Sequence, residues 1–264
     1  MMIYQYNYFT SSGVDKENQL FKGHALYFIK KARFFLITVS ILLILSKPGI
    51  CSLERDIQSW INLTATGSFK KNKASNHWRY WLEGQERFGD DSSRITQTLL
   101  RPGIGYAINA NTSIWLGYAW VHTGAPLTNN PFTENRIWQQ LLWVKTNQYL
   151  TFTSRTRTEQ RFLENNSKTA FRARELIKLS IPWRRESKFS LVTSNELFWH
   201  KNNFVGRNSR GFDQNRIFIG FGYKLNPAIN TEIGYMNQYI RRFNVPNFLA
   251  NILSINFFLN LDQV

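Results

Sequence analysis

The chain lacks the residues that several common kinds of site require. Its 264 residues include a single cysteine, Cys51, which excludes a disulfide scaffold and any cysteine-based zinc site. The four histidines lie far apart in the sequence, and no GxxxxGK[ST] phosphate-binding loop occurs. We therefore expect no metal site and no cofactor in this protein.

Acidic residues are also scarce. The chain has 17 Asp and Glu against 33 Lys and Arg, which gives a formal charge of +16. Such a balance often indicates binding to nucleic acid. Here the basic residues alternate with aromatic residues, which make up 16% of the chain, and do not form a connected run. We therefore expect no nucleic-acid partner.

A hydrophobic run long enough for a membrane-spanning helix is missing as well. Lys30, Lys31 and Arg33 precede thirteen uncharged residues, 34–46, whereas a spanning helix needs about 20. A basic segment followed by a short apolar stretch is typical of a secretory signal. The sequence predicts a cleaved signal peptide within 1–52, with an over-extended N-terminus, and one domain over 53–264. A single N-terminal anchor helix is the alternative.

The remaining sequence has the periodicity of strands. Within 150–162, four charged residues (Arg155, Arg157, Glu159 and Arg161) fall on one face if the segment is extended, and a helix would scatter them. Segments of about ten residues with similar alternation recur down the chain, separated by turn-forming residues. The eleven candidate strands are 57–67, 77–88, 95–108, 113–123, 134–145, 150–162, 169–181, 188–199, 212–224, 231–240 and 249–261.

The connections between these segments alternate in length. Short turns at 109–112, 146–149 and 225–230 alternate with longer loops at 124–133, 200–211 and 241–248. This alternation is typical of an outer-membrane barrel, with an apolar face toward lipid and a polar face inside. Bacterial barrels of one chain have an even number of strands. We therefore predict an antiparallel transmembrane β-barrel of 12 strands, with 10 as the second choice. A secreted β-sandwich or soluble barrel is the alternative.

A repeat occurs inside the chain at an offset of 117 residues. Residues 101–120 and 218–237 share a pattern of glycines in which a tyrosine directly follows two of them. Glycine weakens a strand unless its neighbours need the space. We expect these glycines to admit a large side chain or to let the wall bend, with a widened ligand groove as the alternative. The repeated residues are Gly103, Gly105, Tyr106, Gly117 and Tyr118, matched by Gly220, Gly222, Tyr223, Gly234 and Tyr235.

A series of short motifs resembles a known family. They are Trp60, ERF at 86–88, RPG at 101–103, GYAW at 117–120, ENRIWQQ at 134–140, NELF at 195–198 and DQNR at 213–216. In this order and spacing the chain is similar to the bacterial family called domain of unknown function 2490, over roughly 55–260. The resemblance implies a signal-bearing β-barrel of the Gram-negative outer membrane. It implies no established activity, so no catalytic residues are carried over.

The strongest charged cluster falls on three consecutive strands. A turn near 146–149 predicts Arg136 opposite Glu159 and Glu134 opposite Arg161. All these side chains would face the lumen, where an unpaired arginine is costly. The predicted lumen charge network is Glu134, Arg136, Arg155, Arg157, Glu159, Arg161, Arg172 and Arg174. Within it, the next hairpin should place Glu159 opposite Arg172 and Arg157 opposite Arg174.

Three functions are compatible with this sequence. The first is a passive outer-membrane barrel whose basic lumen conducts or binds small anionic solutes, because a ladder of arginines favours anions. The second is a non-conducting structural or interaction barrel. The third is an enzyme that acts on outer-membrane lipid, which His122 and His200 support poorly because no serine motif accompanies them. We expect no enzyme. Outer-membrane lipid and the barrel-assembly machinery are the partners that the class implies.

Overall fold

The computed structural model describes residues 53–69, 77–125, 127–128, 130–164, 166–203 and 210–263. The predicted signal segment, 1–52, lies outside these residues. The described chain forms eleven strands, and every segment that alternation predicted is one of them. They are β1 (Leu53–Ser68), β2 (Trp78–Gly89), β3 (Arg94–Ala107), β4 (Thr112–Thr123), β5 (Phe132–Thr146), β6 (Thr151–Leu163), β7 (Ala170–Pro182), β8 (Phe189–His200), β9 (Gly211–Lys224), β10 (Ile229–Ile240) and β11 (Asn247–Asn260). A short 3-10 helix, η1 (Leu261–Gln263), follows.

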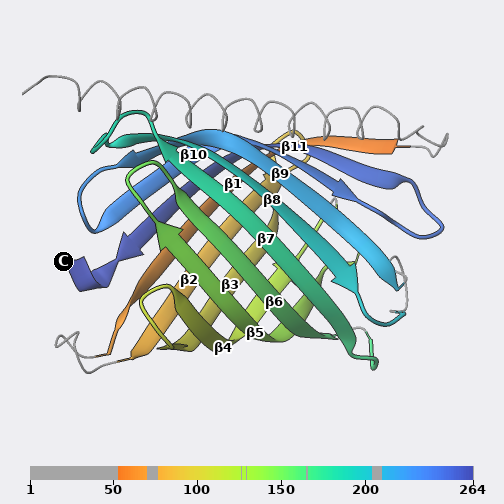
Figure 1. Cartoon of the computed structure of the whole chain (residues 1–264). Helices are drawn as coiled ribbons and strands as arrows, with labels where there is room; N and C mark the ends of the chain where they lie inside the picture. Colours follow the sequence, from red (N-terminus) through yellow and green to blue (C-terminus); the bar gives the residue numbers. More distant parts are fainter. Residues whose placement is uncertain are drawn as a thin grey trace, which may run out of the picture. The chain divides into compact units, whose positions relative to one another are not determined.

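The strands close into one barrel, which confirms the all-β fold (Figure 1). Each strand pairs antiparallel with its neighbour in sequence, and β1 pairs with β11 along 53–66 in parallel. The prediction of 12 or 10 strands was wrong. An odd number of up-and-down strands leaves the first and last strands running the same way, so the barrel closes through a parallel seam instead of needing a twelfth strand.

Side chains alternate between a buried interior and an exposed exterior. On β5, Glu134, Arg136 and Trp138 are buried, whereas Ile137 and Leu141 are 44% and 47% exposed. The same alternation places aliphatic and aromatic residues on most of the outer wall. A soluble sandwich has the opposite arrangement, because its apolar faces pack against each other. The apolar face here has no protein layer over it among the described residues.

Two apolar clusters also lie inside the barrel, so its interior is not uniformly charged. One joins β1 to β11, and Leu127 from the loop between β4 and β5 packs against it. The other joins β4 to β5. The first consists of Trp60, Phe248, Ala250 and Ile252, and the second of Trp115, Ala119 and Trp138.

The two ends of the barrel are named here by the ends of β1. The Leu53 end carries the connections after the even-numbered strands, and the Ser68 end carries those after the odd-numbered strands. Because β11 runs parallel to β1, it finishes at the Ser68 end. At that end Asp262 in η1 accepts a hydrogen bond from the main-chain N–H of Ser68, at 2.7 Å. The described chain therefore begins at one end and finishes at the other.

Candidate functional site

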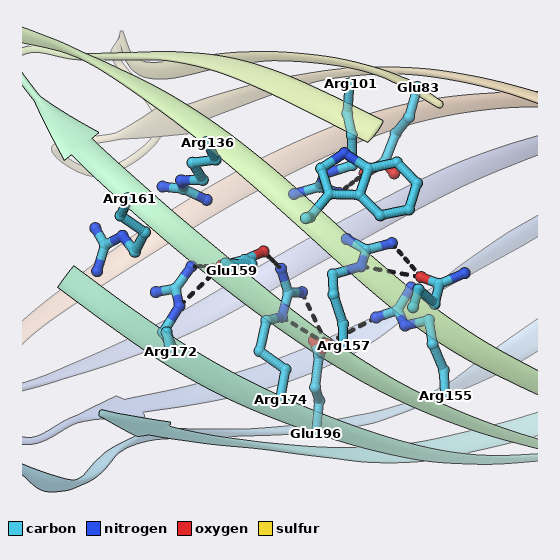
Figure 2. A network of polar contacts seen from close by, with 12 residues as sticks. Glu83, Arg101, Arg136, Arg155, Arg157, Glu159, Arg161, Arg172, Arg174 and Glu196 are labelled. Carbon is cyan, nitrogen blue, oxygen red and sulfur yellow. Dashed lines mark hydrogen bonds and ion pairs between the residues drawn. The ribbon is translucent and has the colours of Figure 1, made fainter. Parts of the chain in front are cut away.

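Three buried glutamates inside the barrel each accept hydrogen bonds from at least two arginines. Glu159 on β6 lies between two arginines of β7, as Figure 2 shows. Its Oε2 accepts from Arg172 Nη2 at 2.5 Å, and its Oε1 accepts from Arg174 Nη1 at 2.7 Å. All three side chains are nearly inaccessible to solvent.

Glu134 and Glu196 repeat this arrangement on either side of Glu159. Glu134 accepts from Arg136 Nε at 2.8 Å and also from Arg161. Glu196, on β8, accepts from Arg174 and Arg155, each with Nη2 at 2.7 Å. Each carboxylate therefore carries one negative charge among two or more guanidinium groups, and the network as a whole stays positive.

One arginine at the centre of the network pairs with an amide instead of a carboxylate. Arg157 is completely buried, and its guanidinium donates two hydrogen bonds to Gln140 Oε1, at 2.9 and 2.6 Å. The same group lies 4.8 Å from the ring centre of Trp138, close enough for a cation–π contact. These neutral partners hold the guanidinium in place, and no carboxylate among the described residues accepts a hydrogen bond from it.

Arg87 on β2 has the same kind of surroundings. It donates to Gln85 Oε1 at 2.6 Å and to Gln97 Oε1 at 2.6 Å, and it lies 3.9 Å from the ring centre of Trp60. No carboxylate among the described residues pairs with it. Arg216 on β9 approaches the same ring from a distance of 4.9 Å. Two guanidinium groups therefore make cation–π contacts with the Trp60 ring.

Seven arginines line a chamber of about 160 Å³ near the Leu53 end of the barrel. Asp213 is the acidic residue that lines it. Glu134, Glu159 and Glu196 do not line the chamber, and they pair from behind with four of its arginines, Arg136, Arg161, Arg172 and Arg174. Arg101 pairs at 2.6 Å with Glu83, which also lies outside the chamber lining. The seven arginines that line this arginine chamber are Arg87, Arg101, Arg136, Arg161, Arg172, Arg174 and Arg216.

A second cavity of about 290 Å³ lies next to the arginine chamber. The two share Trp60 and four arginines, so these side chains form the partition between them. The second cavity is more mixed in character, with Glu83, Glu196 and Glu232 among its lining residues. The shared arginines are Arg87, Arg101, Arg174 and Arg216.

Comparison with known proteins matches residues 57–248 to the family described as protein of unknown function DUF2490. The chain belongs to this family. The chain is also similar to an uncharacterised protein of Methylorubrum extorquens, 33% identical over 208 residues, which cover 78% of this chain and 88% of that protein. No solved structure matches the chain.

In this DUF2490 protein the eight residues predicted to form the lumen network all face the interior, and they lie on β5, β6 and β7. The predicted pairing of β6 with β7 agrees with the structure, since Glu159 is opposite Arg172 and Arg157 is opposite Arg174. The predicted pairing of β5 with β6 was wrong. Arg136 is opposite Arg161, because the connecting turn covers 147–150 and not 146–149. When a turn moves by one residue along the chain, each residue of the first strand faces a residue two positions further along the second strand.

Sequence reasoning missed the interior residues that come from other strands. Three such residues belong to the network or to the lining of the arginine chamber, although their strands are distant in sequence from β6: Glu196 on β8, Arg216 on β9 and Arg87 on β2. The alternation of each strand could have assigned them to one face. It could not have shown that these faces meet inside a closed barrel.

The repeated glycines face inward, and the tyrosines that follow them face outward. A side chain at Gly103 would lie 2.5 Å from Cζ2 of Trp138, and one at Gly105 would overlap the ring of Trp115. The two glycines thus make room for large neighbouring side chains. The outward tyrosines, from 36% to 48% exposed, are Tyr106, Tyr118, Tyr223 and Tyr235.

The two histidines considered for catalysis lie apart and in different surroundings. His122 is exposed on the outer wall and stacks on Trp120, with ring centres 6.2 Å apart. His200 is buried, with Nε2 3.2 Å from Asp213. Within the described residues, no group of three His, Cys, Asp or Glu side chains is placed to hold a metal ion. Nor does that part of the chain contain a helix long and apolar enough to cross a membrane.

Proposed function

We propose that this DUF2490 protein is an outer-membrane β-barrel of a Gram-negative bacterium and that it binds small anionic solutes in the arginine chamber. The observation that carries the proposal is the charge of the chamber lining, whose charged residues are seven arginines and one aspartate. Guanidinium groups bind carboxylate and phosphate oxygens through paired, charge-assisted hydrogen bonds. A chamber of this size suits a small oxyanion or a small carboxylate.

The membrane location is supported by the outer wall. Ile57, Leu100 and Leu116 come from three strands and are 59%, 54% and 58% exposed. Outer-membrane barrels direct such residues toward lipid and keep the polar residues inside. The family resemblance and the predicted signal peptide support the same location and an export route through the barrel-assembly machinery.

The proposed mode of action is binding or slow passage, in contrast to the free diffusion of a porin. Side chains fill much of the cross-section, and Trp138, Arg157 and Phe198 in the interior are almost completely buried. An anion that leaves the arginine chamber for the second cavity must pass the four shared arginines. The same dense interior favours, as a second candidate, a structural barrel that does not conduct ions.

The test is phosphate binding by the full-length protein, exported and purified from membranes in detergent and measured by isothermal titration calorimetry. We expect Arg87→Gln to weaken binding about tenfold, which corresponds to about 1.4 kcal/mol and to the loss of one charge-assisted hydrogen bond. Arg87 is suited to this test because its removal leaves no carboxylate without a partner. The matched control is Arg94→Gln, since Arg94 pairs with Asp90 on the exposed turn after β2.

Three outcomes separate the candidates. Phosphate binding that Arg87→Gln weakens and Arg94→Gln does not supports the arginine chamber as the site. Absence of binding to the folded wild-type barrel would contradict it and favour the structural barrel. A single-channel conductance as large as that of an open porin in planar bilayers would contradict the partition between the two cavities.

A further inference from the structure

A stripe of adjacent polar side chains runs over the outer wall on β5, β6 and β7. On β6, four successive outward positions are hydroxyl or amide side chains, and polar residues of β5 and β7 lie beside them. All lie near the middle of their strands, where strands β1, β3, β4 and β9 present exposed aliphatic residues. The polar stripe consists of Ser154, Thr156, Thr158 and Gln160 on β6, Gln139 on β5 and Glu175 on β7.

Hydrogen bonds connect the stripe in two groups. On the β7 side, the Glu175 carboxylate accepts from Ser154 Oγ at 3.0 Å and from Thr156 Oγ1 at 2.5 Å. On the β5 side, the amides of Gln139 and Gln160 each donate to the other, at 3.0 and 3.1 Å. The carboxylate group thus lies on the side of β6 that pairs with β7, and the amide group lies on the side that pairs with β5.

Both groups keep hydrogen-bonding capacity that these contacts do not use. A carboxylate offers about four acceptor positions, and Glu175 uses two of them among the described residues. Each primary amide has two N–H donors, and Gln139 and Gln160 each use one. Lipid hydrocarbon supplies no partner for either, and a carboxylate facing it is costly. In the proposed membrane location, the polar stripe therefore favours a protein partner at the depth of the strand centres.

We propose that this partner is a second copy of the chain and that the polar stripe is the centre of a two-fold dimer interface in the membrane. A two-fold axis along the membrane normal, passing beside β6, brings β5 of one copy opposite β7 of its partner. The unused amide donors of one copy then face the unused carboxylate acceptors of the other. The two-fold axis forms this contact twice. Each copy therefore supplies amide donors to its partner on the β5 side and accepts hydrogen bonds from its partner on the β7 side.

This proposal rests on the membrane location given above and is independent of anion binding. The experiment is cysteine crosslinking in outer membranes of cells that express the full chain with Cys51→Ser, which removes the natural thiol. Thr158→Cys places a thiol at the centre of the polar stripe. The matched control, Leu116→Cys, places one on the outer wall of β4, where the native side chain is 58% exposed. Folding is checked by the shift of the barrel between heated and unheated SDS gels.

We expect oxidation to give a band of twice the chain mass for Thr158→Cys, at least tenfold stronger than for Leu116→Cys. Adding Glu175→Leu should abolish that band while the barrel stays folded in the membrane, because leucine suits lipid and accepts no hydrogen bond. No Thr158→Cys dimer from a folded, membrane-embedded barrel would overturn the proposal, and so would equal crosslinking of the two positions.

The remaining outcomes distinguish this proposal from the proposed function. A crosslinked band whose mass identifies a different protein would overturn the second copy as the partner and leave anion binding unaffected. A specific dimer without phosphate binding would support the interface and contradict the anion chamber alone. Recovery of the folded barrel in the soluble fraction would overturn both the interface and the membrane location.

Discussion

The two hairpins of the internal repeat, β3–β4 and β9–β10, are alike on the outside of the barrel and different on the inside. On the outside, Tyr118 donates to Asn135 Oδ1 of the next strand at 2.5 Å, and Tyr235 donates to Asn251 Oδ1 of its next strand at 2.6 Å. The turns are alike too: an asparagine, at 109 and at 226, accepts two main-chain N–H groups in each.

On the inside, the paired glycines have different neighbours. Gly103 is opposite Gly117, and the ring of Trp138 from β5 covers both. Gly234 is opposite Gly220, and there the atoms nearest to an added Cβ at Gly234 belong to the main chain of the opposite strand. One sequence pattern thus serves two purposes. Both glycines of the first hairpin admit the ring of Trp138, whereas Gly234 in the second hairpin serves a close backbone approach, as Gly117 also does toward the carbonyl oxygen of Pro102.

The largest expected effect comes from Gly234→Ala. The added Cβ would lie 2.5 Å from Cα of Gly220 and closer still to the carbonyl oxygen of Ile219. Main chain within a strand pair cannot move aside without breaking ladder hydrogen bonds, so we expect a loss of at least about 3 kcal/mol in the free energy of unfolding. Urea unfolding of the barrel in lipid vesicles, followed by tryptophan fluorescence, measures it.

The control is Gly84→Ala on the outer face of β2, where the nearest atom is in the Leu100 side chain at 3.8 Å. This variant should change stability by less than about 1 kcal/mol. If Gly234→Ala behaved like the control, the close approach of the two backbones in the second hairpin would be contradicted.

A smaller and reversible effect is expected in the first hairpin. Gly103→Ala would press against the ring of Trp138, and side-chain overpacking costs about 1–3 kcal/mol. Because the obstacle is a side chain, Trp138→Phe should relieve it. A double-mutant cycle in the same unfolding assay should show a favourable coupling of about 1 kcal/mol or more. Additive effects would mean that Trp138 is not what requires a glycine there.

The sequence predicted the wall of the barrel better than its closure. Alternation located all eleven strands, because each outward apolar row and inward polar row is a local pattern with a period of two. The predicted number of strands was wrong because the even-number rule for bacterial barrels replaced the eleven strands that alternation had located. Nothing local in β1 or β11 shows that their edges meet in parallel, since that pairing joins residues about 190 positions apart.

The candidate site was predictable in part for the same reason. The arginines of β6 and β7 could be assigned to one face because they are neighbours in a single hairpin. The contact of Glu196 with Arg155 depends on two strand pairings, and the position of Arg216 beside Trp60 depends on closure across the whole barrel. The acceptors and aromatic rings that hold the arginines come from those distant strands. The size of the arginine chamber could therefore not be derived from the sequence.

The smallest effect tests where the two hairpins are alike. Tyr118→Phe removes one hydrogen bond, to Asn135, whereas Tyr235→Phe removes one to Asn251 and a longer one accepted from Asn237 at 3.3 Å. Each variant should cost about 1 kcal/mol in the same unfolding assay. Tyr106→Phe is the control, since that outward hydroxyl makes no hydrogen bond to the described residues, and it should leave stability unchanged. Because both bonds to the next strand lie on the outer wall, and Tyr235 adds only the longer contact with Asn237, the two costs should agree within about 1 kcal/mol. A clear difference between them would show that the repeat is preserved in sequence without being equivalent in energy.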